Sequence, residues 1–202
     1  MARRRQRSRP SALEQQSVLV HTRNLQGHEV RVLSITEVCA VLHRIGSRMK
    51  LKDELLRIAD CLERSRIDYA LCGGLAVVVH GYPRMTKDID ILIRPEDLDR
   101  AREELAKIEY DLEAGTFRFN PGTSKESVLY RVSRAVDTEL TTLDLMLVAP
   151  VFEKVWADRE VIQLGTQSLT IVSKQGLITM KEVAGRPQDI ADIDALRRMD
   201  NP

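Results

Sequence analysis

The spacing of apolar residues predicts helices and strands along most of the chain. Leucine and isoleucine recur every three or four residues between 51 and 62 with charged residues between them, which is typical of an amphipathic helix packed against a sheet. Short runs rich in β-branched residues and bounded by turn residues predict strands. These strands are expected at residues 18–20, 30–33, 67–72, 87–94, 127–132, 138–148, 161–164 and 168–172.

Capping residues place the predicted helices between these strands. Ser34 and Glu37 have the spacing of a capping box, and Pro95 followed by acidic residues suits a first helical turn. The helices are expected at residues 34–44, 51–62, 75–80, 95–108, 150–158, 174–184 and 187–199, with Ile190, Ile193, Leu196 and Met199 on the buried face of the last one. Turn residues predict a loop at 115–124. The pattern indicates an α+β fold, with a small mixed sheet flanked by helices and further helices at its C-terminal end.

The composition is that of a soluble globular protein with a basic arm. Of its 202 residues, 43% are hydrophobic and 30% charged, and the net charge is +1. Five of the first nine residues are arginine, so we expect residues 1–45 to be a partly disordered arm and extension, and 46–202 to form the compact domain. No apolar stretch approaches the roughly 20 residues of a membrane span. Cys39, Cys61 and Cys72 have no paired spacing and are expected to be buried thiols in the cytoplasm.

Two aspartates on one side of a predicted strand are the strongest chemical signal. Asp88 and Asp90 flank Ile89 within an apolar run, and side chains two residues apart in a strand point the same way, roughly 6.5 Å apart. Like charges this close raise each other's pKa unless a divalent cation screens them. Asp144, inside another apolar strand, is the candidate for a third ligand, with Asp137 and Glu139 as competitors. Oxygen ligands of this kind predict a Mg²⁺ site.

A glycine pair precedes these acids. Gly73 and Gly74 lie between a predicted strand and a predicted helix, where backbone N–H groups can face a phosphate and the missing Cβ atoms permit close approach. Most glycine pairs are only turns, so the signal depends on position: strand, glycines, helix, and then the strand with the paired carboxylates.

This order resembles the nucleotidyltransferase superfamily related to DNA polymerase beta. Its signature is a Gly-Gly or Gly-Ser turn, about a dozen residues, an acidic-hydrophobic-acidic triplet and a third acid on a later strand. Thirteen residues separate Gly74 from Asp88 here, and Asp144 has the place of the third acid. The sequence is most similar to the small bacterial and archaeal branch that includes AbiEii-type toxins. The further residues that match this branch are Arg84, Thr86, Lys181, Arg186, Asp189 and Asp192. The likeness spans roughly residues 50–200, and Leu75 departs from it because many members have a small residue there.

The resemblance implies a nucleotidyltransferase fold and an enzyme that moves a nucleoside monophosphate from an NTP to a hydroxyl on a tRNA, a protein or a small molecule. It implies a toxin role with an antitoxin protein as partner. Asp88, Asp90 and Asp144 would be catalytic residues and would hold two Mg²⁺ ions. The nucleotide would be bound by Gly73, Gly74, Arg84, Thr86, Lys181 and Asp192. The alternative is a catalytically idle binding or regulatory module with the same fold.

Several individual residues keep two interpretations. Arg84 and Thr86 could contact the ligand or make bonds that cap their own loop. Lys181 could bind phosphate or be an exposed residue of an amphipathic helix, and Asp192 could orient Lys181 or the acceptor. His80 is expected to be a helix-end residue rather than a base. The three phenylalanines, four tyrosines and one tryptophan predict no stacking platform for single-stranded RNA.

Overall fold

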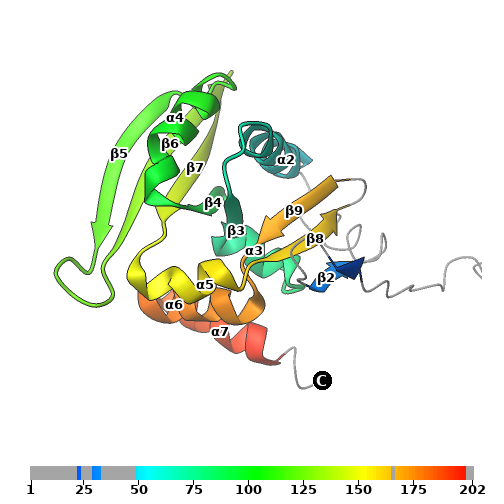
Figure 1. Ribbon diagram of the computed structural model, residues 1–202, viewed down its shortest axis with the longest axis vertical. Helices are drawn as coiled ribbons and strands as arrows, with labels where there is room; N and C mark the ends of the chain where they lie inside the picture. Colours follow the sequence, from blue (N-terminus) through cyan, green and yellow to red (C-terminus); the bar gives the residue numbers. More distant parts are fainter. Residues whose placement is uncertain (1–21, 24–28, 33–48, 165–166, 199–202) are drawn as a thin grey trace, which may run out of the picture.

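The fold is a single mixed sheet with helices packed around it (Figure 1). The computed structural model describes residues 22–23, 29–32, 49–164 and 167–198. The nine strands follow the order β1-β2-β8-β9-β3-β4-β7-β6-β5 across the sheet. Their bounds are β1 Thr22–Arg23, β2 Glu29–Val32, β3 Tyr69–Cys72, β4 Asp88–Ile93, β5 Leu112–Phe119, β6 Ser127–Val136, β7 Glu139–Leu147, β8 Glu160–Leu164 and β9 Gln167–Ile171.

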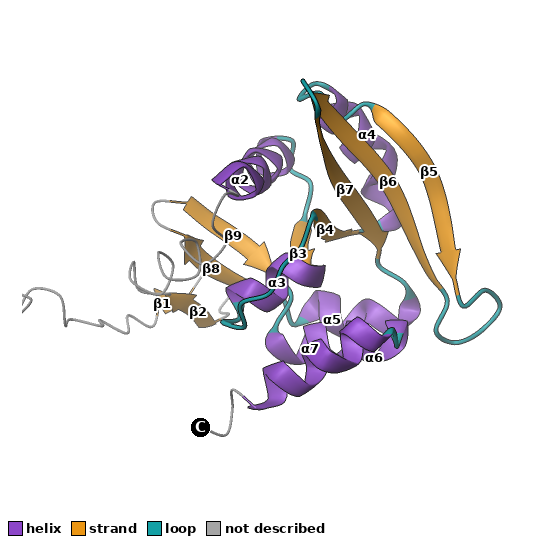
Figure 2. Cartoon of the chain, turned by 180° about the vertical axis from the view of Figure 1, so that it is seen from behind, coloured by secondary structure: helices purple, strands orange, loops and turns teal. Residues whose placement is uncertain are grey.

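The helices gather in groups around this sheet. In both views, α5, α6 and α7 lie together at one end of the molecule, while the long strands β5, β6 and β7 extend away from α3 and the shorter strands (Figures 1 and 2). The bounds are α2 Met49–Arg64, α3 Gly73–Val79, α4 Leu98–Ala106, α5 Glu153–Ala157, α6 Lys174–Ala184 and α7 Pro187–Arg198, with short 3-10 turns η2 Pro95–Asp97 and η3 Pro150–Phe152. This arrangement confirms the predicted α+β fold.

The register of the central strands places the acids side by side. Strand β4 is antiparallel to β3 and parallel to β7, and β7 is antiparallel to β6. Asp90 on β4 is opposite Asp144 on β7, which in turn is opposite Arg131 on β6. Because neighbouring strands lie about 4.8 Å apart, one line across the sheet carries two acids followed by a cation.

The hydrophobic core explains why the predicted helix at 51–62 forms. Leu51, Leu55, Ile58 and Leu62 are all buried, as the helical spacing predicted, and they join one core with the sheet and with α6 and α7. Ile89, Ile91 and Ile93 of β4 are fully buried in the same core. In the described ranges, no helix is long and apolar enough to cross a membrane. Cys61 is partly exposed and Cys72 is buried, and both are free thiols, while Cys39 lies outside the described residues.

Two expectations from the sequence were wrong. Residues 115–124 were expected to be a loop, but β5 runs to Phe119. It is an edge strand whose residues are almost all exposed on both faces, so burial does not alternate along it and leaves no strand pattern in the sequence. On α7, Ile190 was expected in the core but is 57% exposed. Two acids, Asp189 and Asp192, are buried on that helix instead.

The N-terminal predictions are covered only in part. Strands β1 and β2 pair antiparallel, and β2 confirms the predicted strand at 30–33, but the described part of its partner is at Thr22–Arg23. The predicted strand 18–20 and helix 34–44 lie outside the described residues. Further along, β8 and β9 form the predicted hairpin on either side of residue 165.

Candidate functional site

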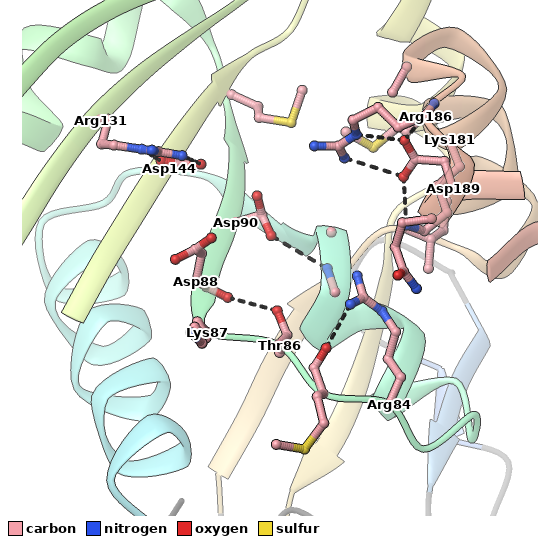
Figure 3. Close-up of a pocket in the computed structure, with 18 residues that line it drawn as sticks. Arg84, Thr86, Lys87, Asp88, Asp90, Arg131, Asp144, Lys181, Arg186 and Asp189 are labelled. Atoms are coloured by element: carbon pink, nitrogen blue, oxygen red, sulfur yellow. Dashed lines mark hydrogen bonds and ion pairs between the residues drawn. The ribbon is translucent and has the colours of Figure 1, made fainter. Parts of the chain in front are cut away.

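A pocket of ≈ 500 Å³ opens on the side of β4 that faces away from the core. The alternation of the strand produces this arrangement, since Ile89 and Ile91 point into the core while Asp88 and Asp90 line the pocket. Figure 3 shows Asp88, Asp90 and Asp144 on one side of the pocket, and Arg84, Lys181 and Arg186 on the other. The pocket therefore has an acidic wall and a basic wall.

Asp90 is the acid with the most perturbed ionisation. Surrounding protein removes much of its solvation, and this burial, together with the nearby charge of Asp144, raises the pKa of Asp90 to about 6. The N–H of Gly74 donates a hydrogen bond of 3.4 Å to its Oδ2 and opposes the rise. The positive groups around Asp90 therefore do not fully offset the cost of ionising its carboxyl group.

The glycine pair is required by the way its neighbours pack. A Cβ on Gly73 would lie 1.9 Å from Oδ2 of Asp90, and Gly73 has a φ of +62°. A Cβ on Gly74 would lie 2.5 Å from Oγ1 of Thr86 and 2.8 Å from Nη2 of Arg84. The sequence predicted these glycines as a phosphate cradle. In the structure they first of all let the acidic strand and the Arg84 loop touch the start of α3, because any side chain would displace them.

Asp144 is held by an arginine that the sequence analysis did not identify. Arg131 donates from Nε to Oδ1 and from Nη2 to Oδ2 of Asp144, both at 2.7 Å. Asp144 is 5% exposed, and its bond raises the pKa of the Arg131 guanidinium. The competing acids Asp137 and Glu139 line a different pocket, so Asp144 is the third acid of this site.

Lys181 lies at the bottom of the basic wall between two buried carboxylates. Its Nζ is 2.6 Å from Oδ2 of Asp192 and 3.2 Å from Oδ1 of Asp189. All three residues are buried, with at most 4% of each exposed. Lys181 is thus not an exposed residue of an amphipathic helix. A lysine ammonium without these two partners would carry an uncompensated charge inside the protein.

Arginines connect this buried cluster to the rim of the pocket. Arg84 Nε lies 3.2 Å from Oδ1 of Asp192, and Arg84 also donates to the carbonyl of Met85 at 2.8 Å. Arg186 Nε donates to Oδ2 of Asp189 at 2.7 Å. Burial of Asp189 opposes ionisation, but the hydrogen bonds from Arg186 and the charge of Lys181 outweigh it and lower the pKa of Asp189.

The structure brings almost all of the predicted site residues together. The pocket is lined by Gly73, Gly74, Arg84, Thr86, Asp88, Asp90, Asp144 and Lys181. Asp192 does not line it and is fully buried behind Lys181, where it can orient that lysine but cannot face a ligand. Thr86 donates from Oγ1 to the carbonyl of Asp88 at 3.5 Å, a contact that caps its loop. His80 is the C-cap residue of α3, as expected, and its Nε2 lies 2.9 Å from the carbonyl of Val172.

The donor set of the acidic wall fits one divalent cation. Asp88 and Asp90 offer carboxylate oxygens, and a cation there would supply positive charge to Asp90, whose pKa is raised. Asp144 uses both oxygens on Arg131. Within the described parts of the chain, no three His, Cys, Asp or Glu side chains are grouped so as to hold a metal ion. Two protein carboxylates completed by substrate phosphates are a normal Mg²⁺ arrangement.

Comparisons with known proteins agree with this geometry. Residues 41–180 match the family model described as "Uncharacterised nucleotidyltransferase". The structure is similar to that of a candidate nucleotidyltransferase from Thermotoga maritima, with a TM-score of 0.51, 15% identity, and 76% of this chain and 94% of that chain covered. This likeness shows a shared fold.

Two further solved structures are similar at lower scores. JHP933 from Helicobacter pylori has a TM-score of 0.44 and 19% identity, with 75% of this chain and 67% of that chain covered. ANT(2″)-Ia, solved in complex with adenylyl-2″-tobramycin, has a TM-score of 0.40 and 14% identity, with 80% and 87% covered. No curated protein matches the chain in sequence.

Proposed function

The chain belongs to the family of uncharacterised nucleotidyltransferases, and from this premise we propose that it moves a nucleoside monophosphate from an NTP to an acceptor hydroxyl. The observation that carries the proposal is the two-sided pocket. Asp88 and Asp90 provide ligands for a divalent cation on one wall, and arginines suited to phosphate border the other wall.

The triphosphate would lie between these walls. Lys87 and Arg186 line the pocket with exposed side chains, and Arg84 lies at its rim with a side chain 19% exposed. A guanidinium can contact phosphate oxygens in pairs, so Arg84 and Arg186 are the groups we assign to phosphate charge. Lys181 borders the pocket, but its Nζ is engaged with two carboxylates, so we assign it to holding α6 and α7 in place.

Asp88 and Asp90 would hold Mg²⁺ against the phosphates. The bound ion would supply Lewis-acid stabilisation of the charge that develops on the phosphate oxygens. The acceptor oxygen forms a bond to the α-phosphorus while the bond to the leaving pyrophosphate breaks on the opposite side. Gly73 and Arg84 lie on the β3 side of Asp90, and Asp144 lies on the β7 side. An in-line reaction with the pyrophosphate on the β3 side would bring the acceptor over β7, beside the Asp144–Arg131 pair, and the hydroxyl proton would pass to solvent.

The acceptor classes consistent with this chemistry are tRNA, protein and small molecules with free hydroxyls. The test is incubation of the chain with Mg²⁺ and each α-labelled NTP, together with total RNA, lysate protein or an aminoglycoside. We expect label transfer and pyrophosphate release with the natural chain, and loss by about two to three orders of magnitude in Asp88→Asn. Asp99→Asn is the matched control, because Asp99 is an exposed aspartate outside the pocket and should leave transfer unchanged.

One observation favours a second candidate, a binding module of the same fold without turnover. Both oxygens of Asp144 accept from Arg131, so a metal ion at the third acid would have to compete with the arginine, which the superfamily pattern does not imply. Pyrophosphate release that requires Asp88 excludes this candidate. No transfer with any NTP and acceptor, from a chain that binds NTP, would establish it.

We further propose a toxin role, which the sequence resemblance motivates. Induced expression in a bacterial host should arrest growth if the transferred group inactivates a cellular acceptor, and Asp88→Asn should abolish the arrest. An antitoxin protein would be the partner that relieves it. Normal growth with the active chain would exclude the toxin role and leave the enzymatic proposal intact.

A further inference from the structure

Arg131 occupies the position at which a second cation would neutralise Asp144. The two residues are direct partners on β6 and β7, and both carboxylate oxygens accept from the guanidinium at 2.7 Å (Figure 3). Asp144 is 5% exposed, so solvent cannot replace the arginine easily. A bidentate pair of this kind is among the strongest side-chain contacts in proteins.

The guanidinium is also supported from the neighbouring edge strand. Its central carbon lies 5.5 Å from the centre of the Phe117 ring of β5, within the range of a cation–π contact. Phe117 lies on the same edge strand as Gly115, the register partner of Arg131. Arg131 is therefore held between an aromatic ring and a carboxylate.

A divalent ion at Asp144 would either displace this contact or lie directly beside the guanidinium. In both cases two groups of the same sign lie close together, which costs free energy through repulsion. A buried carboxylate also loses two charge-assisted hydrogen bonds when its partner leaves. Among the described residues, no arginine is bonded in this way to Asp88 or Asp90, and both line the pocket.

We infer that Arg131 takes the place of a second metal ion in this protein. The site holds one divalent cation, on Asp88 and Asp90, and the Arg131 guanidinium supplies the fixed positive charge beside Asp144 on the acceptor side. This inference rests on the proposed function, because it assumes that Asp88 and Asp90 bind a divalent cation. It makes Arg131 a positioning residue that fixes the third acid.

The test counts Mn²⁺ ions on the full chain by electron paramagnetic resonance. Mn²⁺ is titrated alone and with non-hydrolysable α,β-methylene nucleoside triphosphates, after correction for Mn²⁺ on free nucleotide. We expect one protein-held ion per chain in the natural protein and two in Arg131→Met, because the freed Asp144 becomes a ligand. Arg118→Met is the control, since Arg118 is an exposed arginine on β5 that pairs with Glu126 outside the pocket, and it should keep one ion.

The ion counts test the role of Arg131 separately from the proposed function. Two ions on the natural chain, or one ion on a folded Arg131→Met, would overturn the role of Arg131 and leave the proposed function standing. No ion on the natural chain, with or without nucleotide, would count against the metal site and hence against the proposed function as well. Fluorescence of Trp156, the only tryptophan, reports whether each variant is folded. The count on the natural chain decides the inference even if Arg131→Met does not fold.

Discussion

Asp90 and Asp144 are register partners on the adjacent parallel strands β4 and β7, yet in the described part of the chain only Asp144 has an arginine bonded to it. The sheet brings the two carboxylates together, and their surroundings then separate them chemically. Asp144 is neutralised by Arg131, whereas Asp90 is left with a raised pKa of about 6. The two neighbouring acids therefore differ in how readily each can bind a metal ion.

Asp90 should make the stability of the metal-free protein depend on pH. Its pKa is about 6 in the folded chain and about 4 in an unfolded one, so between these values the folded state binds more protons and the free energy of unfolding falls as the pH rises. Asp90→Asn removes this effect. We expect its stability relative to the natural chain to increase by roughly 2 kcal/mol from pH 4 to pH 7.

Urea unfolding followed by Trp156 fluorescence in EDTA measures this difference at several pH values. Mg²⁺ at pH 7 should stabilise the natural chain and leave Asp90→Asn unchanged, because the ion binds the ionised carboxylate. A stability difference between the two proteins that stays constant from pH 4 to pH 7 would contradict a raised pKa of Asp90 in the folded chain.

Gly73→Ala should damage the site as well as the backbone. The new Cβ would lie 1.9 Å from Oδ2 of Asp90, in addition to the strain of a positive φ. We expect a loss of about 3 kcal/mol in the free energy of unfolding from the clash and the strain together. Gly122→Ala is the matched control, since Gly122 has a φ of +74° with open space around its Cβ.

The control should lose only about 1 kcal/mol, which is the strain alone. Mn²⁺ binding separates the two variants further, because only Gly73→Ala displaces Asp90. Equal losses of stability in both variants, with Mn²⁺ binding intact in both, would show that the close approach of Gly73 and Asp90 is not needed for stability or metal binding.

Lys181→Met should destabilise the fold rather than only weaken nucleotide binding. It removes the ammonium between Asp189 and Asp192 and leaves two buried carboxylates with only Arg186 and Arg84, so we expect a loss of about 3 to 5 kcal/mol. Lys154→Met, at an exposed lysine paired with Asp158, should lose less than about 1 kcal/mol. The double variant Lys181→Met/Asp192→Leu should recover part of the stability, as measured by thermal unfolding. A loss in Lys181→Met no larger than in the control would assign Lys181 to the ligand instead.

Arg186→Gln should raise the KM for NTP and also lower the stability, because Arg186 donates to buried Asp189. Its side chain is 74% exposed at the rim of the pocket, and a lost charge-assisted contact to phosphate corresponds to about a tenfold change. Arg197→Gln, at another exposed arginine of the C-terminal helices that pairs with Glu182, should leave the KM unchanged. Steady-state pyrophosphate release at varied NTP measures both. The same KM in both variants would remove Arg186 from the phosphate site.

Local pattern was enough to predict the acidic strand and its role in the fold. Ile89 and Ile91 alternate with Asp88 and Asp90, so periodicity alone shows which side chains enter the core and which two face out together. Edge strand β5 could not be found this way, because both of its faces are exposed and its residues resemble a loop.

Contacts between distant elements limited the prediction of the site. Asp192 was predicted as a ligand contact or a helper, and only the packing of α7 against α6 shows that it is buried on Lys181. Arg131 was missed because its pairing depends on the register of β6 with β7. The only sign in the sequence was an arginine within the apolar strand 127–132. Its position alone does not show which acid it pairs with.

The ion-pair cluster around Lys181 also affects when the chain can fold during its synthesis. Asp189 and Asp192 belong to α7, so a ribosome-bound chain that ends before this helix has emerged contains the acidic strand and the glycines but lacks the counterions for Lys181. Folding of this side of the pocket must then wait until α7 has been translated. A product terminated before α7 would leave the Lys181 ammonium without its two carboxylate partners and should not complete the pocket.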